Sequence, residues 1–143
     1  MAETAPRTDA GPMALTLTLS SQPAFLETIE ALVVRLGEQA GCAPDASGRL
    51  GLAVRRALGL LIVRARALSP PRQLEVGFTA NDRVARVELR YARGADTCEP
   101  TFDDLLTADA AGADLETLVD RIEITHDDGR SCCRITQQVR TSR

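Results

Sequence analysis

The sequence contains no lysine, so all 17 of its basic residues are arginines. It also contains no tryptophan, and aromatic residues make up only 3% of the chain. With a formal net charge of −3 and few rings to stack on bases, the chain lacks the surface of a general nucleic-acid-binding protein. The absence of lysine also excludes a phosphate loop of the G-x-x-x-x-G-K-[ST] kind, in which lysine contacts the nucleotide phosphates.

The chain is equally poor in residues for nucleophilic or metal chemistry. His126 is its single histidine, so a Ser-His-Asp or Cys-His site would have to use it. Because His126 stands beside a predicted turn, a surface position is the stronger expectation. The cysteines, Cys42, Cys98, Cys132 and Cys133, lack the spacing of a metal site and are expected to be reduced thiols. We expect no catalytic residue, no metal and no cofactor.

Long apolar runs are absent as well. No stretch of about 18 apolar residues exists to span a membrane. Residues 1–13 lack the apolar segment of a signal peptide and are predicted to form a disordered tail. The sequence therefore predicts a cytoplasmic protein with no membrane partner.

The composition is that of one globular domain. The 143 residues are 44% hydrophobic and 26% charged, which is enough apolar material for a sizeable core. We place this domain at residues 14–140 and treat residues 141–143 as a C-terminal tail.

A strand and a helix are predicted at the start of the domain. Leucines alternate with threonines over Ala14–Ser20, which is the pattern of a half-buried strand. Apolar residues then recur at helical spacing over Pro23–Ala40. Ser21 is the expected N-cap of this helix, and Gly41 is its expected C-terminal stop.

The second predicted helix is the most distinctive segment. Asp45 or Ser47 can cap it, and LGLAVRRALGLLIVRA at 50–65 is apolar on nearly every side, which predicts a buried helix. Its narrow polar strip consists of three arginines, Arg55, Arg56 and Arg64. They could bind a phosphate or a partner's carboxylate, or form a solvated or ion-paired helix edge, which is the stronger expectation. Gly51 and Gly59 inside the helix predict close packing against a neighbouring element.

Two hairpins are predicted after the helices, with turns at 81–82 and 127–129. Their inward-facing residues should be Leu74, Val76, Phe78, Val87, Leu89, Tyr91, Ile122, Ile124, Cys133, Ile135 and Val139. Residues 92–112 between the hairpins are polar and irregular apart from a possible helical turn at Phe102–Leu106. Asp114–Val119 predicts a short helix.

These elements predict an α/β (α+β) two-layer sandwich, in which helices cover one face of a mixed, mainly antiparallel sheet. One core is expected to contain Leu17, Leu52, Leu58, Ile62, Val76, Leu89, Ile124 and Ile135.

Two residue pairs admit a functional interpretation. Cys132 and Cys133 could be a redox pair, but neighbours on a strand point to opposite faces, so a core Cys133 and a surface Cys132 are expected. Asp103-Asp104 and Asp127-Asp128 could bind a cation, although capping and turn roles are the stronger expectation.

The segment LGLAVRRALGLLIVRA resembles a helix of the GHKL (histidine kinase-like) ATPase superfamily. It is most similar to the bacterial anti-sigma factor serine-protein kinases, in which the pattern runs roughly L-x-L-A-V-S-E-A-x-x-N-A-x-x-H-A. The order of predicted elements is also similar over residues 14–140. The resemblance implies a histidine kinase-like ATPase fold, dimers, and transcription regulation by partner switching with a sigma factor or its antagonist.

The family's nucleotide-binding residues are mostly replaced in this sequence. By the resemblance, Arg56 stands for the base-activating glutamate, Leu60 for the magnesium-binding asparagine and Tyr91 for the adenine-binding aspartate. Arginine cannot act as a base, and leucine offers magnesium no oxygen ligand. Gly94 is displaced by one position, and a later lid motif keeps only Gly112. The predicted vestigial nucleotide pocket consists of Arg56, Leu60, Arg64, Tyr91, Gly94 and Gly112.

The function expected from this pattern is that of a pseudoenzyme that regulates by protein contact. Its partner would be a sigma factor or an anti-sigma antagonist, and a homodimer is expected. Two alternatives remain open at the level of sequence. One is an active ATP-binding serine kinase with rearranged contacts, and the other is a structural oligomerisation module.

Overall fold

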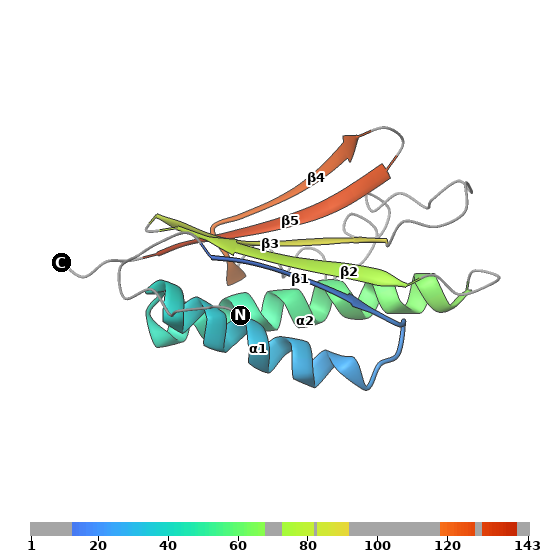
Figure 1. Ribbon diagram of the computed structural model, residues 1–143, viewed down its shortest axis with the longest axis horizontal. Helices are drawn as coiled ribbons and strands as arrows, with labels where there is room; N and C mark the ends of the chain where they lie inside the picture. Colours follow the sequence, from blue (N-terminus) through green and yellow to red (C-terminus); the bar gives the residue numbers. More distant parts are fainter. Residues whose placement is uncertain (1–12, 68–72, 82, 92–117, 128–129, 140–143) are drawn as a thin grey trace, which may run out of the picture.

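In the part of the chain that the structure describes, five strands form one sheet and two helices lie against one of its faces (Figure 1). The computed structural model describes residues 13–67, 73–81, 83–91, 118–127 and 130–139. The elements, in chain order, are β1 (Met13–Leu19), α1 (Phe25–Ala40), α2 (Pro44–Ala67), β2 (Leu74–Ala80), β3 (Val84–Tyr91), β4 (Arg121–Asp127) and β5 (Arg130–Gln138). The two-layer sandwich with helices on one face is therefore confirmed.

The sheet is antiparallel at every described pairing, in the order β1-β2-β3-β5-β4. The prediction of a mixed sheet is wrong for these strands, and the connections explain why. Two helices separate β1 from β2, so the chain returns along the sheet in the direction opposite to β1. β4 does run parallel to β3, but β5 lies between them, so the two parallel strands never pair.

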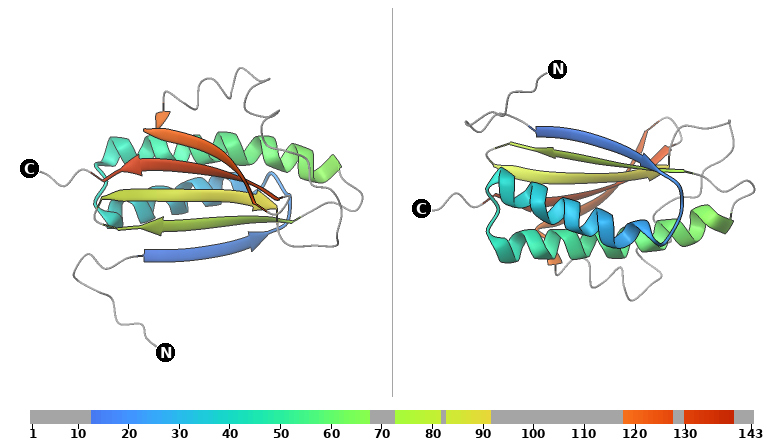
Figure 2. Two further views of the ribbon diagram at one scale, coloured as in Figure 1. Left: turned by 90° about the horizontal axis from the view of Figure 1, so that it is seen from above. Right: turned by 60° about the horizontal axis from the view of Figure 1, so that its bottom comes forward.

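The helices lie side by side on the same face of the sheet, while the opposite face carries no helix in the described part of the chain (Figure 2). Strand residues alternate between the two faces. In β2 and β3, the predicted inward-facing residues are all buried, namely Leu74, Val76, Phe78, Val87, Leu89 and Tyr91. We call the uncovered side the open face of the sheet.

The predicted core is largely correct, except at Leu52 and on the exposed side of α2. Five of the expected residues are buried, and Leu17 and Ile124 pack half-buried against them. Leu52 is only half-buried. The prediction that α2 is buried on all sides is wrong, because Val63 is 68% exposed. One face of α2 contacts the sheet and α1. Apolar residues such as Val63 also lie on α2 outside that contact.

The start of α1 differs from the prediction. Ser21 does not cap the helix, because the capping position is Ala24 and its side chain makes no capping hydrogen bond. A backbone turn precedes the helix instead, in which Phe25 N–H donates to Gln22 O and Leu26 N–H donates to Pro23 O. These carbonyls satisfy N–H groups of the first helical turn that a side-chain cap would otherwise serve.

The end of α1 is as predicted. Gly41 adopts a left-handed conformation with φ of 110°, which glycine reaches without a steric penalty. The Cys42 N–H donates to Gly37 O at 2.9 Å and closes the helix end.

α2 begins earlier than the predicted caps allow. Pro44 is its first residue, a position where the missing N–H costs nothing and the fixed φ suits a helix. Asp45 therefore lies in the first turn, where its carboxylate accepts the Ala46 N–H at 3.0 Å. Ser47 lies inside the helix and is buried, with its N–H donating to Ala43 O.

The two helices pack most closely at Gly51. A Cβ at this position would stand 2.5 Å from Val34 Cγ2 and 3.1 Å from the Glu30 carbonyl oxygen, so close packing is confirmed for Gly51. A Cβ at Gly59 would meet only Leu26 Cδ1, at an ordinary 3.8 Å. The prediction of close packing is therefore wrong for Gly59.

Both predicted hairpins are present. The Asn81 side chain accepts the N–H groups of Arg83 and Val84 at 2.7 and 2.9 Å and so organises the turn between β2 and β3. In the second hairpin, Ile122 lies opposite Ile135 and Ile124 lies opposite Cys133, as the alternation predicts. The predicted irregular region 92–112, with its possible turn at Phe102–Leu106, lies outside the described residues, as does most of the predicted helix Asp114–Val119. Neither described helix is long and apolar enough to cross a membrane.

Candidate functional site

The structure places two residues of the predicted vestigial pocket in or against the hydrophobic core. Tyr91 ends β3, lies opposite Leu74 of β2 and is fully buried. Leu60 lies in the second half of α2 and packs half-buried against the same core. At both positions the side chain is used for packing, and neither supplies a carboxylate or an amide oxygen.

The structure describes only some of the remaining residues of the predicted pocket. Arg56 lies half-buried on α2, one turn before Leu60. Arg64 belongs to α2, but its side chain lies outside the described residues, as do Gly94 and Gly112. The structure therefore relates Leu60 and Tyr91 through a common core, and the rest of the predicted pocket stays a prediction.

Arg55 has a structural role that the sequence left open. Its Nη1 donates to the Glu30 carboxylate of α1 at 2.9 Å, so the guanidinium joins the two helices. Of the two interpretations of the arginine strip, the ion-paired helix edge is confirmed for Arg55.

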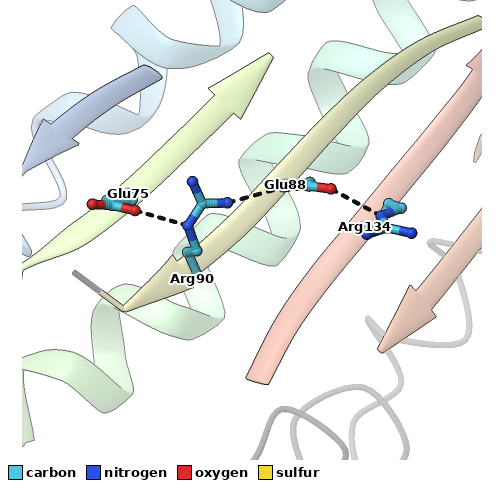
Figure 3. A network of polar contacts seen from close by, with 4 residues as sticks. All are labelled: Glu75, Glu88, Arg90 and Arg134. Atoms are coloured by element: carbon cyan, nitrogen blue, oxygen red, sulfur yellow. Dashed lines mark hydrogen bonds and ion pairs between the residues drawn. The ribbon is translucent and has the colours of Figure 1, made fainter. Parts of the chain in front are cut away.

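A network of alternating charges crosses the open face of the sheet (Figure 3). Arg90 Nε donates to Glu75 at 2.7 Å, and Arg90 Nη1 donates to Glu88 at 3.2 Å. The other oxygen of Glu88 accepts Arg134 Nε at 2.9 Å. These four residues thereby link β2, β3 and β5 across the centre of the sheet.

The charged row continues onto the edge strand β4. Arg134 Nη1 lies 3.9 Å from Glu123, and Arg121 Nη2 pairs with the same glutamate at 2.9 Å. The side chains in these pairs are 25–33% exposed, apart from Arg121 at 68%, so solvent still screens them and each pair contributes about 1 kcal/mol or less. The network is consistent with a solvated face, and opposite charges on neighbouring strands favour the register in which these strands pair.

This network was not predicted from the sequence, although the sequence carries a signal for it. In VELRY the charged residues alternate with the apolar ones, so a strand that buries its apolar residues must place Glu88 and Arg90 together on the other face. What the sequence does not give is the partner strand, because β5 pairs with β3 from more than forty residues away in the chain, as the Glu88–Arg134 contact shows.

Arg86 is not part of this charged network. It lies on the central strand β3, opposite Thr79 on β2 and Thr136 on β5. Its Nε is buried and has no hydrogen-bond partner, and no carboxylate of the described residues pairs with its guanidinium. An unsatisfied buried donor costs about 1–3 kcal/mol. Arg86 is therefore a guanidinium of the open face that pairs with no carboxylate among the described residues.

The two neighbouring cysteines lie as predicted on opposite faces. Cys133 is buried in the core, and this burial raises the pKa of its thiol to about 12. Cys132 lies half-buried on the open face between Arg90 and Arg134. Burial and the Glu88 carboxylate raise the pKa of Cys132, and the two guanidinium groups only partly oppose them. The thiolate is the reactive form of cysteine, so neither residue is poised as a nucleophile.

A small cluster of polar residues lies where α2 begins and β5 ends. Burial raises the pKa of the Cys42 thiol, the nearby Ser47 hydroxyl opposes this, and the negative charge of Asp120 raises the pKa further. The Asp120 carboxylate accepts the Gln138 N–H at 2.7 Å and the Gln137 side-chain amide at 3.4 Å. With the thiol held neutral, this cluster is a structural contact between β5 and the segment before β4.

The described residues include no group of three or more histidine, cysteine, aspartate or glutamate side chains that could hold a metal ion. His126 lies within β4 opposite Ser131, but its side chain is outside the described part, as are Asp103-Asp104 and Asp128. Comparison of the chain with protein-family models and with curated protein sequences finds no match.

Proposed function

We propose that this chain is a regulatory protein-binding domain of the histidine kinase-like ATPase fold, related to anti-sigma factor kinases but without nucleotide-dependent activity. The observation that carries the proposal is the complete burial of Tyr91 where the resemblance expects the adenine-binding carboxylate. A phenol ring packed in the core offers adenine no carboxylate acceptor.

The order of elements supports the same proposal. A strand, two helices, a hairpin and a second hairpin follow one another as in the resembling kinases, and the helices cover one face of the sheet. Leu60 packs against the core at the position of the magnesium-binding asparagine, and leucine offers no oxygen ligand. The scaffold is kept, while the groups that would bind Mg·ATP are replaced.

A surface suited to protein contact is present on the same scaffold. The open face carries the charged network, and Arg86 on its central strand has a buried Nε without a partner. Guanidinium groups favour planar carboxylates, so a protein partner that supplies an aspartate or glutamate would complete this position. In this proposal the domain acts in the cytoplasm on a sigma factor or on its antagonist.

Titration calorimetry with Mg·ATP tests the loss of nucleotide binding. We expect no measurable heat of binding at millimolar nucleotide. A micromolar dissociation constant that weakens in Arg56→Ala, but not in the exposed Arg66→Ala on another side of α2, would replace this proposal with an active kinase.

Affinity capture from cells of the source organism tests the regulatory role. The expected result is capture of a sigma factor or its antagonist, with recovery reduced in Arg86→Met and retained in Arg83→Met, an exposed arginine of the neighbouring turn. Recovery of neither class of protein would favour a structural module.

A further inference from the structure

Side chains on the open face form rows that run across neighbouring strands, because opposite residues of paired strands point to the same side of the sheet. One such row crosses four strands and consists of Thr79 on β2, Arg86 on β3, Thr136 on β5 and Arg121 on β4. Neighbouring strands lie about 4.8 Å apart, so each of these side chains is within reach of the next one. We call these four residues the arginine–threonine row.

The arginine–threonine row contains no carboxylate, and the acidic side chains beside it are already engaged. In the next row, Glu88 uses both of its oxygens for arginines of the charged network, and Glu123 also pairs within that network. Asp120, which precedes β4, accepts the Gln138 N–H. Since no carboxylate of the described residues pairs with Arg86, this row has positive charge that is not balanced.

Arg86 is also suited to bind a ligand at little cost. Its Nε is buried and makes no hydrogen bond, although the residue as a whole is only half-buried. A guanidinium that turns toward a ligand therefore breaks no hydrogen bond of Nε and gains one. An unsatisfied buried donor destabilises the unliganded state, so binding relieves a strain that already exists.

The donors of the row match a tetrahedral oxyanion better than a planar one. The guanidinium of Arg86 can satisfy both oxygens of a carboxylate by itself, which leaves the threonine hydroxyls on either side of it unused. A phosphate has further oxygens for Thr79 and Thr136. Its second negative charge also matches a second arginine, Arg121, whose side chain is 68% exposed and pairs with Glu123 in a screened contact that is easily given up.

We propose that the arginine–threonine row binds a phosphate group, which is supplied by inorganic phosphate or by a phosphate monoester. The guanidinium of Arg86 binds two of its oxygens, the hydroxyls of Thr79 and Thr136 donate to the phosphate from either side, and Arg121 adds charge. No described helix covers this face, so the remaining oxygen is free to carry a substituent. A phosphate and a partner's carboxylate would compete for Arg86, but phosphate binding needs no partner and is independent of the proposed regulatory function.

Titration of the purified chain with sodium phosphate, followed by amide shifts in NMR spectra at constant ionic strength, tests the site. The amides of Thr79, Arg86 and Thr136 should shift and saturate, with a dissociation constant on the order of 10 mM, because each exposed charge pair contributes little. Arg86→Met should abolish these shifts. It should also fold at least as stably as the native chain, because it removes a buried donor that has no partner.

Three matched variants show whether the row itself is responsible. Arg83→Met, which removes an exposed arginine of the neighbouring turn, should leave phosphate binding unchanged. Arg56→Ala should also leave it unchanged, which separates this site from the vestigial nucleotide pocket. Thr136→Val should weaken binding several-fold because one hydroxyl is lost, whereas Thr125→Val, a half-buried threonine in another row of the same face, should not.

Three probes identify the ligand chemistry. Acetate should bind at least about tenfold more weakly than phosphate, because it offers one charge and two oxygens. O-Phosphoserine distinguishes the two sources of phosphate: equal affinity means that the site accepts a phosphate monoester, and binding of inorganic phosphate alone restricts it to the free ion. Shifts at all exposed arginines without saturation, saturable shifts that survive Arg86→Met, or acetate binding as tight as that of phosphate would each overturn the proposal.

Discussion

Leu58 shows how strongly a single residue of α2 supports the fold. Its side chain is fully buried within the core. Leu58→Ala should lower the free energy of unfolding by about 2–5 kcal/mol, because both the buried methyl groups and the packing around them are lost. Val63→Ala on the exposed side of the same helix should change it by less than about 0.5 kcal/mol. Urea denaturation of the two variants makes the comparison, and equal losses would place Val63 in the core.

The buried thiol of Cys133 should make stability fall at alkaline pH. Its pKa is raised by burial from an ordinary 9.0 to about 12, so the folded protein keeps the proton that the unfolded chain releases. The contribution is complete below pH 9 and is lost as the pH rises toward 12. The chain has no lysine to titrate in this range. Denaturation at pH 8 to 11 should show a steeper decline for the native chain than for Cys133→Ala, and parallel declines would contradict this assignment.

At the residue scale, the sequence predicts what depends on alternation along one strand and misses what depends on local backbone geometry. The opposite placement of Cys132 and Cys133 follows from the strand period alone. The predicted cap at Ser21 fails because backbone carbonyls of the preceding turn take its place. At the predicted pocket positions, the sequence alone gives residues that cannot act as a base (Arg56), that offer no oxygen ligand (Leu60) or that carry no carboxylate (Tyr91).

From the contact between α1 and α2 we predict opposite effects of substitution at Gly51 and at Gly59. Gly51→Ala should destabilise the protein by about 1–3 kcal/mol despite alanine's better helix propensity, because the added Cβ would collide with Val34 and approach the Glu30 backbone. Gly59→Ala has room for its methyl group and should stabilise by up to about 1 kcal/mol. Thermal unfolding distinguishes them, and a stabilised Gly51→Ala would show that the helices can separate without cost.

At the element scale, the sequence predicts which helices and strands form and which side of each strand is buried. It predicts less well where an element begins or ends and which strands pair. The alternating residues of β2 and β3 identify both strands and their buried sides. The start of α2 at Pro44 was missed because Asp45 and Ser47 are residues that cap helices elsewhere as readily as they occupy a first turn. The antiparallel arrangement depends on β5 entering between β3 and β4, and nothing in the local sequence of β5 specifies that neighbour.

At the scale of the whole molecule, the described sheet keeps two sides with different chemistry. The helix-covered side holds the core, including Tyr91, whereas the open face holds Arg86 and the charged network. The two-layer class could be predicted because the helical and strand periods in the sequence leave few other arrangements. The arrangement of charges on the open face could not be predicted, since it depends on pairing between strands that are distant in the chain.

From the pairing of β1 with β2 we infer an order in which the strands join during folding. The helix pair and both hairpins close short loops, but Leu19 must find Leu74 across the whole helical segment, which is a costlier closure. We expect β1 to join after the transition state. Leu19→Ala should therefore accelerate unfolding and leave the refolding rate nearly unchanged, whereas Val87→Ala in the central strand should slow refolding. Stopped-flow kinetics in urea measures both, and slower refolding of Leu19→Ala would mean that β1 belongs to the folding nucleus.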